Sequence, residues 1–482
     1  MESRDVVIIG SGYGGTIPAT RLAQAGMQVT VLERGPRFDT RDFVQSDRIR
    51  DLDRVLDIVL TSENVAFRTG KLVGGASINM DGAHFRMPQK SFLVRDRNGR
   101  PYWPAGFSRA MLDPYYARAE QMLRVRQLAW TEISRGGGMF AKMLAAAGAS
   151  CERSRLNYTD CLHCGFCTQG CIYEKKISLL LSYIPVAEAA GAEFRPGCDV
   201  QTIEPMGTGY RVRYVLNGTA QEIFGQRVVV GAGGIHTPAL LKRSTSLLTG
   251  LSPQVGENFN SNGEHPFVGI LPPEFDDLSR YACFKGMENA GLMSFHWYDS
   301  DGITMHPGAG LEPSVLVSSL AAANHPVLPQ RAWGMEYKRF AESVYPHRII
   351  AFSVLGLADG HRAVTLQPSG KVDLVNRDRT AFDSYLDRVD RVLAQVSSTT
   401  GVTLLPVVPR KQAGTTSSHL LSACRMAETI DQGVVNPDGE VFGHPNLWIC
   451  DASTVPYALA VNPAITISAI AERTSEKIVA RG

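Results

Sequence analysis

Residues 5–15 read DVVIIGSGYGG, an apolar β-branched run that opens directly into a glycine-rich turn. A helical pattern follows through Gln24, and residues 28–32 form a second β-branched run. Strand, glycine turn, helix and strand in this order predict a βαβ unit, which requires parallel strands. The sequence therefore predicts an α/β fold with a parallel sheet at its N-terminus.

The glycine turn carries the pattern G-x-G-x-x-G, with Glu33 at the end of the second strand. Gly10 allows a tight turn, Gly12 lets the backbone approach a pyrophosphate, and Gly15 permits close packing of helix and strand. Glu33 would accept hydrogen bonds from ribose hydroxyls. The unit thus predicts a dinucleotide site, provided that Pro18 falls in the first helical turn, where a missing N–H costs little.

The composition is that of a globular protein: 482 residues, 44% hydrophobic and 20% charged, with a formal net charge of +2. The two signs of charge are interspersed, without the basic stripe that nucleic-acid binding usually needs, so we expect a small-molecule partner. No stretch approaches 18 uninterrupted apolar residues, which predicts no membrane insertion. We see no leader before the first apolar run and expect a cytoplasmic protein.

Strand and helix signals divide the chain into a discontinuous cofactor domain and an inserted substrate domain. Short runs broken by Gly, Pro and Asp over residues 264–374 predict an antiparallel sheet, and residues 377–400 show the spacing of a long helix. The predicted segments are 1–95, 181–263 and 405–482 for the cofactor domain, 96–180 for a linking segment with a cysteine cluster, and 264–404 for the substrate domain.

Several further motifs resemble those of the glucose-methanol-choline (GMC) oxidoreductases, in particular their cholesterol-oxidase-like branch. They are GKLVGGASIN at 70–79, VGAGGIHTP at 230–238, SHLLSACRM at 418–426, CDASTVP at 450–456 and VNPAITI at 461–467. The resemblance implies a Rossmann-like FAD-binding domain with a parallel sheet, plus a substrate domain built on an antiparallel sheet with helices. It also implies oxidation of an alcohol.

The same resemblance implies which residues contact FAD. Some family members attach FAD to a histidine near the second glycine motif, but residues 70–79 contain none, so we expect non-covalent FAD. The predicted cofactor-binding residues are Gly10, Gly12, Tyr13, Gly14, Gly15, Glu33, Arg34, Gly74, Gly75, Ser77, Asn79, Val200, Gly231, Ala232, Asp451, Ala452 and Pro463.

His419 and Asn462 match the family's catalytic pair in its His/Asn version. Oxidation of an alcohol removes a hydroxyl proton and passes a hydride to the flavin, so a base with a pKa near neutrality should contact the oxygen. Histidine suits that task, and an uncharged amide can orient the same oxygen. Pro463 would then begin a helix whose positive end points at the flavin.

Four cysteines, Cys161, Cys164, Cys167 and Cys171, follow the C-x2-C-x2-C-x3-C spacing of a bacterial ferredoxin. An iron–sulfur cluster there would make the enzyme a dehydrogenase that passes electrons onward. The proline expected after the fourth cysteine is absent, and no second cysteine run is present. Buried free thiols beside the FAD are the favoured interpretation; an iron–sulfur cluster and a zinc site remain as alternatives.

The branch of the family implies a fairly apolar substrate, such as a sterol-like or secondary alcohol, with oxygen or another redox acceptor reoxidising FAD. Ala464 replaces a bulky aromatic of the cholesterol-oxidase pattern, and only Glu288 is a candidate for the acid of a sterol isomerase. A polyol or sugar is the alternative substrate. A non-redox lyase of the hydroxynitrile type, which keeps the fold and FAD, is the alternative function.

Overall fold

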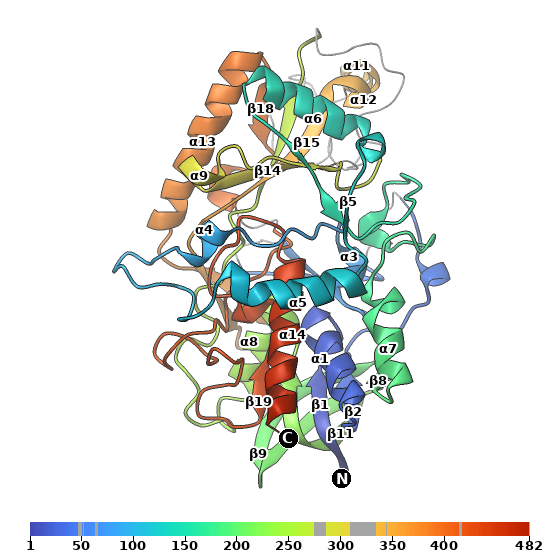
Figure 1. Ribbon diagram of the computed structural model, residues 1–482, viewed down its shortest axis with the longest axis vertical. Helices are drawn as coiled ribbons and strands as arrows, with labels where there is room; N and C mark the ends of the chain where they lie inside the picture. The colour runs from blue at the N-terminus through green and yellow to red at the C-terminus, as the bar shows by residue number, and fades with distance from the viewer. Residues whose placement is uncertain are drawn as a thin grey trace.

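The computed structural model of the protein describes residues 1–46, 51, 53–62, 66–273, 286–308, 334–343, 345–413 and 417–481. Two sheets organise it: a seven-stranded sheet around the two chain ends and a four-stranded antiparallel sheet at the opposite end of the molecule (Figure 1). The first contains the predicted parallel strands and the second belongs to the predicted substrate domain. The mixed α/β fold is confirmed, whereas the five-segment domain division stays a prediction.

The large sheet has the order β8-β2-β1-β11-β10-β9, with β19 paired to β11. Strands β8, β2, β1, β11 and β19 run parallel, while β10 and β9 continue the sheet as an antiparallel ribbon. Their bounds are β1 Glu2–Ile9, β2 Val29–Leu32, β8 Glu193–Arg195, β9 Cys198–Met206, β10 Gly209–Leu216, β11 Thr219–Val230 and β19 Leu447–Ile449.

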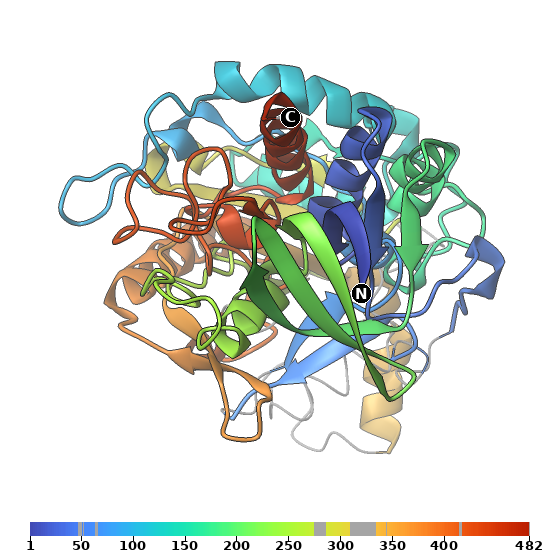
Figure 2. The ribbon, with the colours of Figure 1, turned by 90° about the horizontal axis from the view of Figure 1, so that it is seen from below.

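Helices α1 and α14 lie side by side against one face of this sheet, with α5 outside them (Figure 2). The strand residues beneath are apolar and fully buried, as expected for parallel strands covered on both faces. The helices of this domain are α1 Tyr13–Gln24, α3 Ala76–Asn79, α4 Gln89–Phe92, α5 Arg109–Met122, α7 Tyr183–Ala189, α8 Gly233–Arg243 and α14 Ala464–Ala480.

The antiparallel sheet has the order β14-β15-β12-β18. Its outer face packs Phe267, Met305, Phe352 and Val354 against α6 and α13, forming a second apolar core. The predicted long helix is α13. The bounds are β12 His265–Ile270, β14 Ile303–Gly308, β15 Ile349–Gly356, β18 Thr403–Pro406, α6 Arg135–Ala146, α9 Tyr298–Asp301, α11 Met335–Ser343, α12 Tyr345–Arg348 and α13 Thr380–Thr400.

Short two-stranded ribbons complete the described structure. Two of them, β3–β4 and β16–β17, contribute residues to the wall of the site described below. Their bounds are β3 Leu56–Leu60 with β4 Ala66–Gly70, β16 Arg362–Leu366 with β17 Val372–Asn376, β5 Arg126–Gln127 with β7 Arg155–Leu156, and β6 Glu152–Arg153 with β13 Leu292–Met293.

Pro18 corrects one expectation, because it is the sixth residue of α1 and lies in the second turn. A proline there cannot donate to the carbonyl of Gly14 four residues earlier. That carbonyl instead accepts the thiol of Cys450, which is 3.0 Å away and follows β19. A residue more than 400 positions distant thus replaces the missing helical bond, and the helix continues through the proline.

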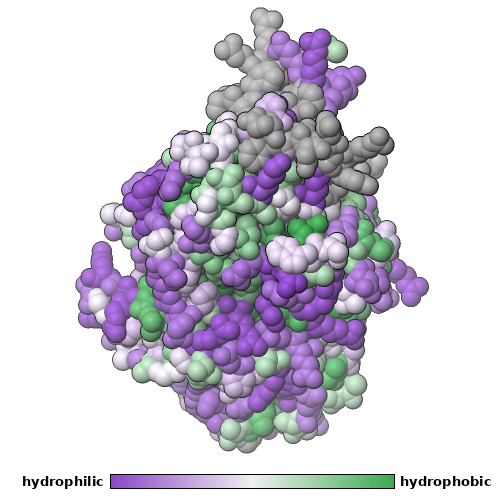
Figure 3. All heavy atoms as spheres, turned by 45° about the horizontal axis from the view of Figure 1, so that its top comes forward, coloured by the Kyte–Doolittle hydropathy of each residue, from purple (hydrophilic) through white to green (hydrophobic). Residues whose placement is uncertain are grey.

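The exterior of the described chain is mixed in polarity. The face in Figure 3 is largely hydrophilic, with hydrophobic atoms in scattered patches. No helix within the described ranges is both long and apolar enough to cross a bilayer.

A buried ion pair joins the helices of the cofactor domain. The carboxylate of Glu472 on α14, with a fully buried side chain, accepts two hydrogen bonds from Arg21 of α1, at 2.8 and 2.7 Å. It also accepts the hydroxyl of Tyr183 on α7 at 2.6 Å. Since removal of one partner would leave the others buried and unpaired, this contact should contribute strongly to stability.

We predict that Glu472→Ala destabilises the protein by about 3 kcal/mol, the usual cost of breaking a buried ion pair. The control is Glu476→Ala, one turn further along α14, where the carboxylate is half exposed and pairs with the exposed Arg118. It should cost less than about 1 kcal/mol. Thermal unfolding of both variants measures the difference, and equal melting shifts would contradict the role given to the buried pair.

Candidate active site

A single cavity of about 960 Å³ lies where β1, β11 and β19 end, and residues of both domains line it. It extends from the glycine turn before α1 to the start of α14. Clefts at the carboxyl ends of parallel strands are the usual ligand sites of open α/β sheets. The position of the cavity is therefore the one that the βαβ pattern predicts.

The glycines of the turn permit backbone contacts that no side chain would tolerate. A Cβ on Gly10 would lie 2.6 Å from the carbonyl oxygen of Gly231, and one on Gly14 would lie 2.5 Å from the Cβ of Asp451. A Cβ on Gly15 would lie 1.8 Å from the carbonyl oxygen of Gly10, which confirms its packing role. The space around Gly12 is open instead, so a ligand can approach this part of the backbone.

Glu33 fixes the conformation of the turn. One carboxylate oxygen accepts the backbone N–H and the hydroxyl of Ser11, at 2.9 and 2.7 Å, and the other accepts the N–H of Gly35 at 2.7 Å. Burial raises the pKa of Glu33, while these donors favour its charged form. A carboxylate offers about four acceptor positions, so room remains for a ligand hydroxyl.

The structure brings most of the predicted cofactor residues to the cavity wall. Gly15, Gly74 and Ser77 do not line it; Gly74 donates its N–H to the Ser11 hydroxyl, and the Ser77 hydroxyl donates to the carbonyl of Gly74. The predicted residues on the wall are Gly10, Gly12, Tyr13, Gly14, Glu33, Arg34, Gly75, Asn79, Val200, Gly231, Ala232, Asp451, Ala452 and Pro463.

Asp451 serves mainly as a structural acceptor at the end of β19. Its two carboxylate oxygens accept the N–H of Gly233, the hydroxyl of Thr237, and both the N–H and the hydroxyl of Ser453. Burial raises its pKa, and these donors oppose that effect. Asp451 therefore holds the start of α8 beside the glycine turn.

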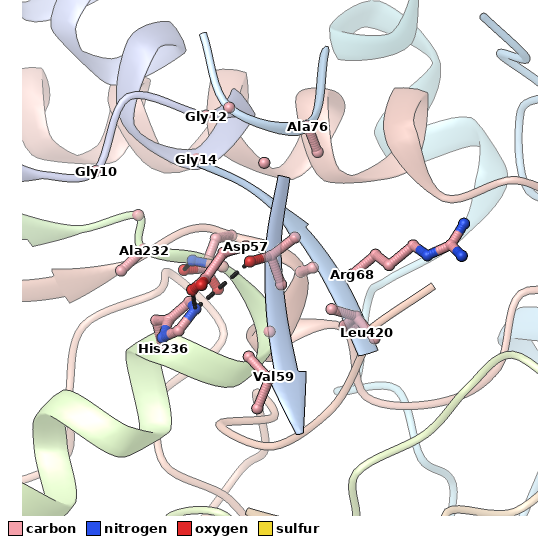
Figure 4. A pocket seen from close by; sticks show the side chains of 18 of the residues that line it. Gly10, Gly12, Gly14, Asp57, Val59, Arg68, Ala76, Ala232, His236 and Leu420 are labelled. Atoms are coloured by element: carbon pink, nitrogen blue, oxygen red, sulfur yellow. Dashed lines mark hydrogen bonds and ion pairs between the residues drawn. The ribbon is translucent and has the colours of Figure 1, made fainter. Parts of the chain in front are cut away.

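A charged cluster from three segments stands at another part of the wall. Asp57 of β3 pairs with Arg34 at 2.6 Å and with His236 of α8 at 3.3 Å (Figure 4). Its two partners hold the pKa of Asp57 well below its usual range, whereas burial lowers the pKa of His236. Since Arg34 is committed to this cluster, its clearest role is to fix β3 over the cavity.

His419 and Asn462, 43 positions apart in the sequence, both line the cavity at the end nearer the substrate domain. Both are buried, and the side-chain oxygen of Asn462 lacks a hydrogen-bond partner within the described part of the chain. An unpaired buried amide oxygen costs free energy unless a ligand donates a hydrogen bond to it. The structure thus places both predicted residues on the cavity wall, where the Asn462 oxygen can accept a hydrogen bond from a ligand.

Asn262 and Glu264, which sequence reasoning missed, hold this pair. The Asn262 oxygen accepts the N–H groups of Leu459 and Ala460, and its amide nitrogen donates to the carbonyl of Val461 at 2.8 Å. The same nitrogen lies 3.4 Å from Nδ1 of His419. One side chain therefore positions both the histidine and the loop that leads to Asn462.

Glu264 lies on the other side of the same ring nitrogen. Its carboxylate is 3.5 Å from Nδ1 of His419 and also accepts the hydroxyl of Ser417 and the N–H of Ser418. The Ser417 hydroxyl in turn accepts the N–H of His419 at 2.8 Å. A cluster of asparagines before Glu264 was the available signal, because asparagine readily adopts the left-handed φ of 59° found at Asn262.

The four-cysteine segment was the candidate for a metal site. Within the described part of the chain, no three or more His, Cys, Asp or Glu side chains are arranged to hold a metal ion. The iron–sulfur and zinc alternatives are therefore not supported. Buried Lys176 organises the segment instead, since its ammonium donates to the carbonyls of Ile78, Met80 and Cys167.

Comparison with known proteins places the chain in a family. The N-terminal domain of the GMC oxidoreductases matches residues 5–264 and their C-terminal domain matches residues 365–471. The protein belongs to the GMC oxidoreductase family. It is therefore an FAD-dependent enzyme of the alcohol oxidoreductase type, as the sequence motifs predicted.

Its relatives have diverse names. A cholesterol oxidase of Mycobacterium tuberculosis is 26% identical and aligns with 98% of this chain and 90% of its own length. A 2-methyl-1,2-propanediol dehydrogenase of Mycolicibacterium austroafricanum is 25% identical, with 100% and 96% covered. The crystal structure of a pyridoxine 4-oxidase has the same fold, with a TM-score of 0.68 at 16% identity and 98% of both chains covered.

We predict that Glu33→Ala weakens FAD binding by at least about tenfold, because it removes charge-assisted bonds that shape the turn. Glu193→Ala, which removes an exposed carboxylate on the adjacent strand β8, is the matched control and should retain FAD. Titration of FAD-stripped protein with FAD, followed by flavin fluorescence, measures both affinities. Unchanged affinity in Glu33→Ala would contradict the assignment.

Proposed function

We propose that the enzyme oxidises the CH–OH group of an alcohol by hydride transfer to non-covalently bound FAD, with His419 as the base and Asn462 orienting the substrate oxygen. The observation that supports this most directly is the placement of both side chains on one cavity wall, with the Asn462 oxygen unpaired. Oxygen or another small acceptor would reoxidise the FAD.

The part of the cavity beside the glycine turn and the N-terminus of α1 suits the pyrophosphate of FAD. Gly12 leaves open space, and α1 begins there without any side chain capping its first N–H groups. Free N–H groups at a helix N-terminus favour a pyrophosphate. Glu33 and Val200 would hold the adenosine part, while Pro463 and the first turn of α14 would face the flavin ring. When bound, FAD supplies the acceptor for the hydride that leaves the substrate carbon.

His419 would take the hydroxyl proton at Nε2. The contacts recorded for its ring are at Nδ1, with Asn262 and Glu264, so Nε2 is the nitrogen left for the cavity. With its proton on Nδ1, facing the Glu264 carboxylate at 3.5 Å, the ring would keep the Nε2 lone pair for the substrate, and the Asn262 amide nitrogen would donate to the carbonyl of Val461 alone. Glu264 thereby favours the tautomer that can act as a base and stabilises the cation that forms.

Asn462 would hold the same substrate oxygen. Its carboxamide can exchange hydrogen bonds with a hydroxyl without changing charge, so it restricts the orientation of the C–H bond. The helix α14 begins immediately afterwards, at Ala464, with Pro463 at its N-cap. Its N-terminal N–H groups point their positive dipole toward this end of the cavity, which favours negative charge there.

We predict that His419→Asn retains FAD but slows its reduction by an alcohol by roughly 10²- to 10⁴-fold, the usual contribution of a general base. The control is His296→Asn, since His296 is exposed and outside the cavity wall. Anaerobic stopped-flow absorbance of the flavin measures the reduction. An unaffected rate in His419→Asn would contradict the proposed base, and a wild-type flavin that no alcohol bleaches would favour the lyase.

We further predict that Glu264→Gln lowers kcat by about tenfold or more, because an amide does not stabilise the imidazolium as a carboxylate does. The KM for the alcohol should change far less, since Glu264 acts through His419. Steady-state measurements of kcat and KM for the wild type and the variant with the same alcohol test this. A rise in KM at constant kcat would indicate a direct substrate contact instead.

A further inference from the structure

His306 lines the same cavity as His419, and the proposed chemistry gives it no task. It lines the wall and is only 7% exposed, yet among the residues that the structure describes neither ring nitrogen has a hydrogen-bond partner. An imidazole buried with both nitrogens unpaired loses hydration without compensation, at a cost of about 1–3 kcal/mol for each polar atom. Such a group at a cavity wall indicates that something polar pairs with it.

The register of the substrate sheet places His306 beside the catalytic pair. On β14, Thr304 and His306 share one face, since alternate strand residues point the same way. Met305, between them, belongs to the apolar core on the other face. The Thr304 hydroxyl donates to the carbonyl of Ala460, two residues before Asn462. His306 is thus held on the strand that is anchored to the loop of Asn462.

The electrostatic surroundings of His306 restrict its partner. The carboxylates of Asp81 and Glu264 act on it from two other segments, and both line the cavity, as does His419. Burial lowers the pKa of His306, so at neutral pH the ring is uncharged and offers one N–H donor and one acceptor. Two nearby carboxylates disfavour an anionic partner, whereas a hydroxyl can satisfy a donor and an acceptor together.

Other polar atoms extend this part of the wall. The side-chain oxygen of Asn79 is buried and unpaired, and Asp81 and Thr168 also line the cavity. The Thr168 hydroxyl donates to Glu288 at 2.9 Å. Polar side chains from other segments therefore line the cavity together with His306 and His419.

We propose that His306 binds a second hydroxyl of the substrate, so that the enzyme prefers a neutral diol or polyol, with hydroxyls on neighbouring carbons, over a monohydroxy alcohol or a sterol. This inference rests on the proposed alcohol oxidation and names its substrate class. A hydrocarbon ring system beside His306 would leave both of its ring nitrogens without partners. A second hydroxyl next to the oxidised carbinol pairs with them instead.

The test compares 1,2-hexanediol, 1-hexanol and cholesterol as reductants of the enzyme-bound flavin under anaerobic conditions. Wild-type enzyme should show a kcat/KM for the diol at least about tenfold higher than for 1-hexanol, the factor that one unpaired buried polar group implies. His306→Leu, similar in size but apolar, should lose most of that preference while its rate with 1-hexanol changes little. His306→Gln, which keeps a donor and an acceptor, should retain part of it.

His265→Leu is the matched control, because His265 is buried on β12 of the same sheet, contacts Phe267 and lies outside the cavity wall. It should keep the wild-type preference. Retained flavin absorbance and melting temperature show that each variant is folded. If His306→Leu does not fold, the comparison of diol and monoalcohol with the wild-type enzyme still tests the substrate preference.

Two outcomes would overturn the inference while leaving alcohol oxidation intact: equal kcat/KM for diol and monoalcohol, or a diol preference that survives in His306→Leu. A preference for cholesterol would overturn it in the same way. Failure of all three alcohols to bleach the flavin would instead overturn the proposed oxidation itself, so the two failures are distinguishable.

Discussion

The cofactor site depends on the close approach of three backbone segments at the ends of β1, β11 and β19. Gly10 contacts the carbonyl of Gly231, Gly14 contacts Asp451, and any Cβ at these glycines would overlap its neighbour. Because the backbones touch, the N-terminus of α1, the start of α8 and the segment after β19 form one wall. Glu33 accepts the donors that fix the turn.

At the other end of the cavity, Asn262 has a comparable role. Its carboxamide spans two segments, the histidine at 419 and the loop 459–461, and its backbone adopts a left-handed conformation to do so. The geometry of the proposed catalytic pair is therefore set where the cavity residues of the two sheets meet. Placement of His306 follows from the same junction, through the bond between Thr304 and Ala460.

Local patterns were sufficient to predict the parallel sheet, the glycine turn and Glu33, since each depends on residues close in sequence. Family motifs predicted His419 and Asn462. Asn262, Glu264 and His306 were missed because their positions depend on strand register and on the packing of the two domains. The tolerance of Pro18 in the second turn also depends on a residue distant in sequence, because the thiol of Cys450 replaces the lost helical bond.

The cysteine spacing suggested a metal site that the described structure does not support. Spacing shows that four thiols are near in sequence, but their convergence depends on the fold around them. In the structure Cys167 is buried while Cys164 is exposed, and Lys176 organises the loop through carbonyl oxygens. Within this segment, the carbonyl of Thr168 accepts a hydrogen bond from the Asn79 amide, and both residues line the cavity.

The most direct test of this account is a crystal structure of the protein loaded with FAD. The account predicts the pyrophosphate at the N-terminus of α1, the adenosine beside Glu33 and Val200, and the flavin ring between the start of α14 and the pair His419 and Asn462. A flavin ring bound away from His419, or FAD bound in the reverse direction along the cavity, would contradict it.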